Sequence, residues 1–379
     1  MKLHFIPLLV LFFFFSCASK KEDQTTGLKA YEVDLDAELT SLFDVVTDVE
    51  FTVLEETENS LFGSVGKLAL DGDDLIIITG KGTKAMRFNR EGKYLSSISE
   101  RGRGPKEYSS ISDLMVVDDK VLLLDASRQR ITQWTKDWEY DSAFRLGFGS
   151  RHFIKDSQGY FYDLNYELVA DTIHANVITT GKDFSLELGL IPFKEPKSLL
   201  ISNTLGFIKV DENIHYRPGF SDTVYAILPE RIVKPAYRFE FGKYWRFANE
   251  FQTDMEFWAF MSDSKGKPEA LIYFSNTESE NWIFGIMQLV PTNRTLGVLL
   301  DKNSEKKIYL NIAGGDDFRD SVRPILVENE RVYASIDANH LNYILANYPQ
   351  FEKTIKGNQS LEKVLASENP MIMSFKFKL

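Results

Sequence analysis

The chain has 379 residues, with 44 basic and 55 acidic side chains and a formal net charge of −11 at pH 7. This acidic balance disfavours a nucleic-acid partner, because binding phosphates requires clustered Lys and Arg side chains. The single cysteine excludes an intramolecular disulfide and a cysteine-based metal site. The length allows one large domain or two ordinary ones, and an apolar content of 44% allows a sizeable core.

The first 16 residues have the pattern of a secretory signal peptide. Lys2 precedes an apolar run at residues 5–15, which is too short to span a bilayer stably, and the small residue Ser16 follows. The next residue is the lone cysteine, Cys17, and residues 14–17 resemble the lipobox of bacterial lipoproteins. We therefore predict that Cys17 is the lipidation site and carries palmitate. The alternative is an ordinary signal peptide with an incidental cysteine.

Residues 17–30 are polar and aperiodic, so we expect a lipidated cysteine followed by a flexible tether. An acidic protein gains no electrostatic adhesion to anionic lipid, so the acyl chains must hold it to the outer membrane. Lys21-Glu22-Asp23 resembles the signal that sends Bacteroidetes lipoproteins to the outer face of that membrane. An inward-facing lipoprotein is the alternative.

Beyond the tether, short apolar or alternating runs separated by Gly, Asp and Asn turns predict many strands. Residues 75–79 align with residues 121–125, and Arg87-Phe88 aligns with Gln133-Trp134, 46 residues further along. In each unit an apolar lead-in and an Asp-rich turn precede a buried strand, an alternating strand and a hairpin. This pattern is typical of a four-stranded propeller blade, whose usual period is roughly 40–50 residues.

The same pattern recurs more loosely downstream. Further units are predicted around residues 160–188, 207–227, 282–300 and 324–336, which makes six blades over residues 31–379. Residues 248–262, 339–348 and 361–365 have helical spacing and are predicted to be insertions on one rim. The last residues, 371–379, predict a strand, which would be an exposed edge unless it pairs. We expect residues 31–35 to be its partner, so that N- and C-terminal strands close the ring.

Several motifs resemble the six-bladed, NHL-like β-propeller lipoproteins of Bacteroidetes. They are the Gly-x-Gly-Pro-x-Glu-Tyr segment at residues 102–108, residues 221–225, residues 237–242, and Glu368-Asn369-Pro370 before the last strand. The resemblance spans nearly the whole mature chain and implies an all-β fold of six four-stranded blades. It implies little about function, because a fold does not determine an activity.

Six residues are candidates for ligand binding, and no metal site is expected. Residues 102–108 form a tight loop in which Arg103 and Glu107 would lie near the channel mouth, where Arg can hold a carboxylate or sulfate. Alternatively the loop is a structural linker between blades. Near the strand starts of blades three and four, a cationic cluster for an acidic ligand would consist of Arg151, His152, His215 and Arg217. Local hydrogen-bond partners are the alternative for these histidines.

The sequence therefore predicts a lipid-anchored propeller of the cell envelope that binds a ligand or partner protein without catalysis and without a cofactor. A glycan, a peptide or an envelope protein would be the partner. The alternative is a glycan-active enzyme, a hydrolase or lyase, that uses carboxylates in the propeller funnel as acid and base. Glu107, Asp125 and Asp163 are the candidate carboxylates for that alternative.

Overall fold

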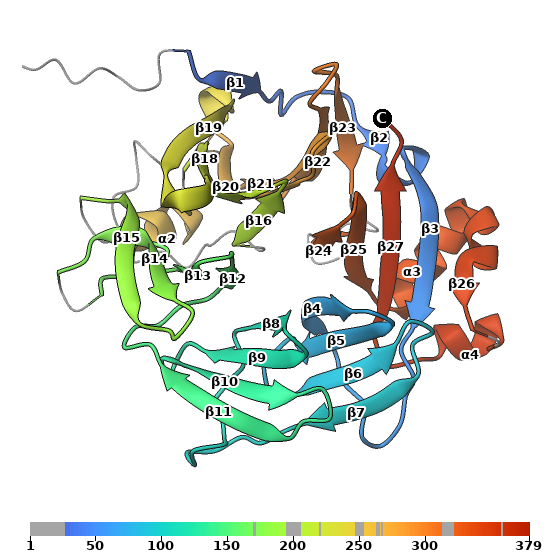
Figure 1. The fold of residues 1–379 in the computed structure, drawn as a ribbon. Helices are drawn as coiled ribbons and strands as arrows, with labels where there is room; N and C mark the ends of the chain where they lie inside the picture. Colours follow the sequence, from blue (N-terminus) through green and yellow to red (C-terminus); the bar gives the residue numbers. More distant parts are fainter. Residues whose placement is uncertain are drawn as a thin grey trace, which may run out of the picture.

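The computed structural model describes residues 27–169, 172–194, 206–219, 221–246, 254–262, 266, 268–312, 322–357 and 359–379. Six sheets stand side by side in a ring, as Figure 1 shows in a view along the ring axis, and they are antiparallel except for one added edge strand in each of three sheets. The fold is thus the predicted six-bladed β-propeller.

The first three blades have four strands each. Blade one contains β4 (Val65–Asp71), β5 (Asp74–Thr79), β6 (Ala85–Asn89) and β7 (Tyr94–Ile98). Blade two contains β8 (Asp113–Val117), β9 (Lys120–Asp125), β10 (Arg130–Thr135) and β11 (Tyr140–Arg145). Blade three contains β12 (Phe153–Lys155), β13 (Gly159–Asp163), β14 (Ala175–Gly181) and β15 (Leu186–Pro192).

Blades four to six have five strands each. Blade four contains β16 (Phe207–Val210), β17 (Asn213–Tyr216), β18 (Thr223–Ile227), β19 (Val233–Glu240) and β1 (Lys29–Glu32). Blade five contains β20 (Ala270–Glu278), β21 (Trp282–Val290), β22 (Thr295–Asp301), β23 (Lys307–Asn311) and β2 (Thr40–Ser41). Blade six contains β24 (Pro324–Glu328), β25 (Arg331–Ile336), β27 (Met371–Phe377), β3 (Val46–Val53) and β26 (Ile355–Lys356).

The predicted repeat is present strand for strand. The aligned runs at residues 75–79 and 121–125 are β5 and β9, and both are buried beyond their first residue. Their continuous apolar sequence follows from their position, because neighbouring blades cover both faces of the second strand of a blade. The core accordingly consists of apolar clusters between adjacent blades.

The ring closes through the C-terminal strand, but residues 31–35 are not its partner. β27 lies between β25 and β3, and Met373 pairs with Phe51. In Figure 1 the red β27 and the blue β3 lie side by side. Tyr31 instead pairs with Phe239 at the outer edge of blade four. The prediction of the partner strand was wrong because an edge strand and a closing strand have the same alternating pattern.

Residues 29–53 form an N-terminal strap around half of the ring. The strap adds β1 in parallel to β19, then β2 in parallel to β23, and then enters blade six as β3. These parallel pairings satisfy backbone groups at outer edges that would otherwise be unpaired.

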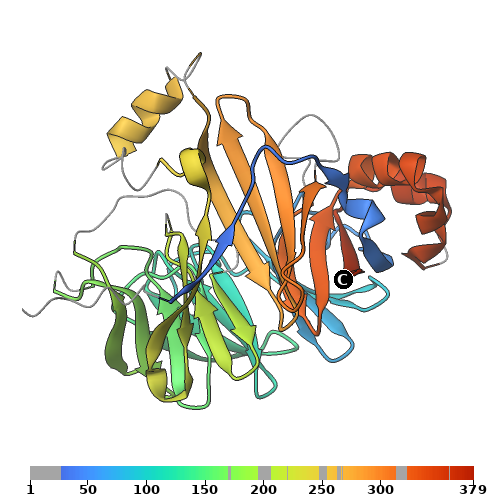
Figure 2. The same ribbon diagram turned by 90° about the horizontal axis from the view of Figure 1, so that it is seen from above.

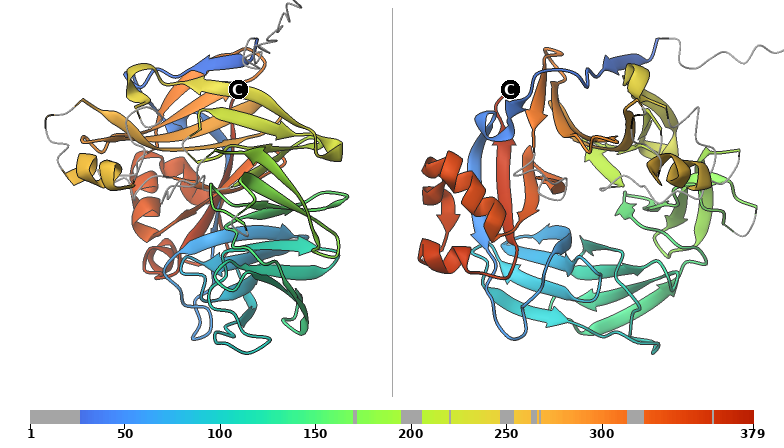
Figure 3. Two further views of the ribbon diagram at one scale, coloured as in Figure 1. Left: turned by 90° about the vertical axis from the view of Figure 1, so that its left-hand side faces the viewer. Right: turned by 180° about the vertical axis from the view of Figure 1, so that it is seen from behind.

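The helical insertions are α2 (Asp254–Ser262), α3 (Ala338–Asn347) and α4 (Leu361–Leu365), with short 3-10 turns at Leu42–Asp44, Pro229–Arg231, Gly242–Tyr244 and Pro349–Thr354. α2 projects away from the sheets in Figures 2 and 3. The other two helices do not decorate the rim as expected. They lie outside blade six, next to β26, which pairs with β3. No helix among the described residues is long and apolar enough to cross a membrane.

The two faces of the ring differ in their loops, because strands alternate in direction. One face carries the first and third hairpin turns of each blade, and we call it the hairpin face. The opposite face carries the second turn of each blade and the connections between blades, and we call it the crossover face.

Candidate functional site

The innermost strands of all six blades line a central channel with a cavity of about 250 Å³. Its wall is mainly apolar and includes Leu68, Leu114, Ile154, Ile208 and Leu326. The polar groups on this wall are Lys67, Asp113, Lys209 and Thr277. A mostly apolar cavity with a few polar side chains is the usual form of a binding site for a small ligand.

A buried charged cluster ties the first three blades together at the crossover end of this channel. Lys67 Nζ lies 2.9 Å from Nδ1 of His152 and 3.6 Å from a carboxylate oxygen of Asp113. Asp113 also accepts a hydrogen bond from the backbone N–H of Phe153. Burial opposes ionisation of Asp113, but the charge of Lys67 and the contact with His152 bring its pKa below the usual value. Asp113 is therefore a buried carboxylate whose negative charge is stabilised by Lys67 and His152.

Gly206 packs directly against the His152 side chain of this cluster. Its φ is +66°, and a Cβ atom there would lie 2.5 Å from Cβ of His152. A larger residue would displace the His152 side chain, so glycine is required for the entry into β16.

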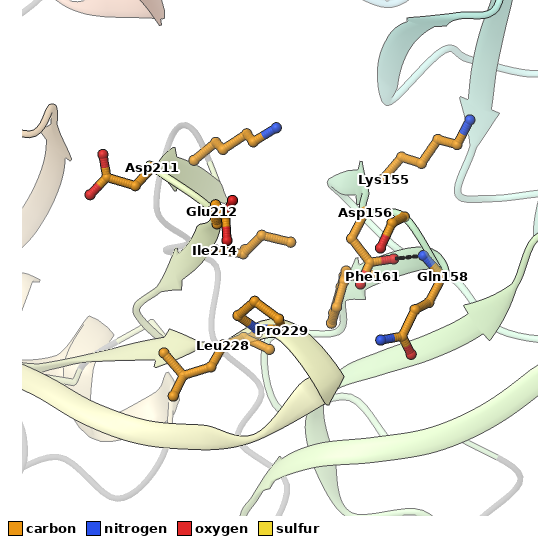
Figure 4. A pocket seen from close by; sticks show the side chains of 12 residues that line it. Lys155, Asp156, Gln158, Phe161, Asp211, Glu212, Ile214, Leu228 and Pro229 are labelled. Carbon is orange, nitrogen blue, oxygen red and sulfur yellow. Dashed lines mark hydrogen bonds between the residues drawn. The ribbon is translucent and has the colours of Figure 1, made fainter.

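Two further pockets open on the hairpin face and share lining residues with the channel. The first, of about 360 Å³, lies between blades three and four over an apolar floor that includes Phe161, Ile214 and Ile227. Figure 4 shows the turn of blade three, with Asp156 and Gln158, opposite the turn of blade four, with Asp211 and Glu212. The second pocket, of about 640 Å³, lies between blades four, five and six.

Lys209 lines the channel and both pockets. Its side chain is exposed, and it makes no hydrogen bond or ion pair with the residues that the structure describes. Because β16 is an innermost strand, the ammonium group has a rigid base at the point where the three cavities meet.

Carboxylates dominate the second pocket, where Asp211, Glu280, Glu328 and Glu330 come from turns of three blades. The hydrogen bond and the charge of the neighbouring Asp211 raise the pKa of Glu280. The carboxyl groups of Asp211 and Glu280, from blades four and five, are therefore neighbours. Glu280 holds its proton more tightly than an isolated glutamate does.

At the floor of the second pocket, Glu278 is completely buried by its neighbours. Its oxygens lie 2.8 Å from Nδ1 of His215 and accept hydrogen bonds from the Tyr237 hydroxyl at 2.8 Å and from Lys302 Nζ at 2.7 Å. Burial raises the pKa of Glu278, but the contact with His215 and the charge of Lys302 outweigh it, and the pKa lies below the usual value.

The loop with Arg103 and Glu107 is fixed by a hydrogen bond within the loop and by hydrogen bonds from Arg128. Glu107 accepts a 2.6 Å hydrogen bond from the backbone N–H of Gly104, and Arg128 donates to the backbone oxygens of Arg103 and Glu107, both at 2.7 Å. The Arg103 side chain is exposed. No residue of this loop lines the channel cavity.

The other predicted site residues are placed in two separate groups. His152 belongs to the cluster with Lys67, next to the half-buried Arg151. His215 and Arg217 face blade five instead. Arg217 is only 3% exposed and donates to Asn276 at 2.8 Å and to the backbone oxygen of Phe274 at 2.6 Å.

Burial lowers the pKa of Arg217 to about 10, and its guanidinium lies 4.4 Å from the ring centre of Phe274. Arg217 therefore belongs to the core between blades four and five. Ligand binding by the six predicted residues stays a prediction.

The carboxylates considered for catalysis are also separate. Asp125 accepts hydrogen bonds from Ser127 and from the backbone of Ser109 in a turn. Asp163 is buried, which raises its pKa, and accepts a 2.6 Å hydrogen bond from the Tyr216 hydroxyl. Cys17 lies outside the described residues. Among those residues, no group of three or more His, Cys, Asp or Glu side chains is arranged to hold a metal ion.

Sequence reasoning missed Lys209, Asp211 and Glu280. Lys209 lies near the end of β16, Asp211 lies in the hairpin turn that follows, and Glu280 lies in another turn much further along the chain. Their charge near hairpin turns was the only local signal, and charged residues are common in solvated turns whether or not they form a site.

A family model described as "Domain of unknown function (DUF4934)" matches residues 30–376, and the chain belongs to this family. No curated protein matches the sequence. The fold is similar to that of a predicted exported protein of Bacteroides fragilis NCTC 9343, with a TM-score of 0.72, 16% identity, and coverage of 92% of this chain and 99% of that one. It is also similar to a DUF4221 family member of Bacteroides vulgatus ATCC 8482, with a TM-score of 0.50, 12% identity, and coverage of 88% and 97%.

Proposed function

We propose that this DUF4934 propeller is an exported, lipid-anchored protein of the cell envelope that binds a ligand or partner protein at its hairpin face. The observation that carries this proposal is the meeting of three cavities at Lys209. Six rigid innermost strands hold the cavities open, and a preformed site loses little entropy on binding.

The remaining parts of the proposal rest on the N-terminal sequence and on the likeness in fold. Cys17 would carry the lipid, and the acidic mature chain would need that anchor to stay at the outer membrane. The similar B. fragilis structure is named as a predicted exported protein, which supports export. A surface-facing position would follow from Lys21-Glu22-Asp23.

Thermal unfolding of the full chain with a panel of soluble glycans and peptides tests the proposal. A ligand at 100 times its Kd adds about 2.7 kcal/mol to the free energy of unfolding and so raises the melting temperature. Lys209→Ala should change the affinity for that ligand. Lys182→Ala, which alters an exposed lysine on another turn of the hairpin face, should leave it unchanged. A ligand bound equally by both variants would contradict the location, and a panel without any binder would contradict binding of these classes.

The carboxyl pair of Asp211 and Glu280 favours a second candidate, glycan cleavage by acid–base catalysis. The hydrogen bond with Asp211 raises the pKa of Glu280, so Glu280 is the candidate acid for such chemistry. Activity would fall as the pH rises through the raised pKa of Glu280, and Glu280→Gln would abolish it. Chromatography of glycans incubated with the chain distinguishes the two candidates, because a binder releases no product.

A further inference from the structure

The pocket between blades three and four lies directly over apolar side chains at the edge of the core. Phe161, Ile214 and Ile227 belong to the apolar cluster between these blades, yet they also line the pocket. Leu228 and Pro229 form another wall, and Figure 4 shows the cavity between them and the two hairpin turns. An apolar group of a ligand could therefore reach the edge of the core without any rearrangement.

Acidic side chains outnumber basic ones around this pocket and the second pocket. Two of the nearby lysines are already held, since Lys155 pairs with Asp118 at 3.0 Å and Lys302 with the buried Glu278 at 2.7 Å. Lys209 is the remaining cation among the described residues that line the two pockets. Asp211, Glu280, Glu328 and Glu330 outnumber it in the second pocket, which therefore favours a cationic group.

The two pockets are neighbours that share Lys209 and Asp211 in their lining, and we call them together the hollow. A single ligand can thus have an apolar group over Phe161 and a cationic group beside Asp211.

We propose that this hollow binds a peptide segment of a partner protein in which a large apolar side chain neighbours a lysine or arginine. The apolar side chain enters the pocket over Phe161 and Ile214, and the basic side chain pairs with Asp211 and Glu280. This inference rests on the proposed function and names its ligand class.

The test uses labelled peptides and the full chain in detergent, with fluorescence anisotropy as the readout. The probes contain Trp and Arg separated by zero to three glycines, with matched peptides in which Ala replaces Trp or Glu replaces Arg. We expect the best Trp–Arg spacing to bind at least tenfold tighter than either matched peptide. Its affinity should fall as salt is raised, because an exposed charge pair is screened.

Variants locate the binding. The double variant Asp211→Asn with Glu280→Gln should weaken binding of the Trp–Arg peptide about tenfold, and Ser157→Trp, on the exposed rim of the apolar pocket, should block it. Glu139→Gln and Lys182→Trp make matched changes on other exposed turns of the hairpin face and should have no effect. Thermal melting of each variant confirms that it is folded.

Equal binding of all peptides, or binding unaffected by the pocket variants, would overturn the inference. A glycan whose binding is lost in Ser157→Trp would overturn it as well, because the hollow would then be a sugar site. In that last case the proposed function survives, whereas a chain that binds neither peptides nor glycans contradicts both.

Discussion

His215 and Glu278 join blades four and five through a contact of 2.8 Å between Nδ1 and Oε1, with the Glu278 carboxylate fully buried. The same carboxylate accepts hydrogen bonds from Tyr237 and Lys302, so strands β17, β19 and the turn after β22 all converge on it. A buried carboxylate with this many donors stabilises the folded state only while it is ionised.

Glu278→Ala should therefore be strongly destabilising. Removing one member of a buried charged network typically costs about 3–5 kcal/mol, because the remaining charges lose their partner. Urea unfolding at neutral pH measures the change. A loss below about 1 kcal/mol would show that the contact between blades four and five does not depend on this carboxylate.

The same residue predicts a pH dependence. The folded pKa of Glu278 is lowered from the usual 4.5, so its contribution is present above about pH 4.5 and is lost as the pH falls through the folded pKa. Glu278→Gln should be less stable than the natural chain at neutral pH, and the difference should shrink under acidic conditions. A constant difference from pH 7 to pH 3 would contradict the assignment.

Arg217→Ala should destabilise the chain by about 3 kcal/mol or more, because it leaves buried oxygens of Phe274 and Asn276 without donors. Arg217→Lys should recover only part of this loss, since an ammonium cannot reproduce the planar fork of donors. Arg103→Ala is the matched control and should change stability by about 0.5 kcal/mol or less. Similar melting of the Arg217 and Arg103 variants would show that Arg217 is not structural.

Deletion of residues 370–379 should prevent folding into a closed ring. The deletion removes β27, which lies between β25 and β3, so each of these strands loses its partner on one side. Phe375→Ala is a milder change at a fully buried side chain and should cost about 3–5 kcal/mol. A soluble truncation that melts like the intact chain would contradict ring closure by β27.

Cys17→Ala should abolish acylation and release the protein from the membrane or leave it unprocessed. Metabolic labelling with palmitate and membrane fractionation measure both effects. Label retained by the variant would rule out Cys17 as the lipidation site.

Replacement of Lys21-Glu22-Asp23 by neutral residues should move the protein from the cell surface to a protected position. The expected readout is loss of cleavage by protease added to intact cells, with the lysed cells as a control for cleavability. Unchanged accessibility would show that this segment is not the signal for surface display.

The blades could be predicted from the sequence because their causes are local. Residues 75–78 and 121–124 are apolar throughout, as second strands buried on both faces must be, and Asp-rich turns precede them. The short helices at residues 338–347 and 361–365 were also predictable, since helical spacing is a property of consecutive residues. In contrast, residues 31–35 and 46–53 both alternate, and nothing local tells an edge strand from a closing strand.

Only the tertiary structure decided which side chains meet. His215 and Glu278 are 63 residues apart, and Lys209 becomes the junction of three cavities because turns from blades three to six surround it. The physical reason is that ring closure sets the distances between blades, whereas sequence patterns report each strand's own burial. Strands could therefore be assigned from their residues, while the partners of a charged side chain depended on the position of the neighbouring blade.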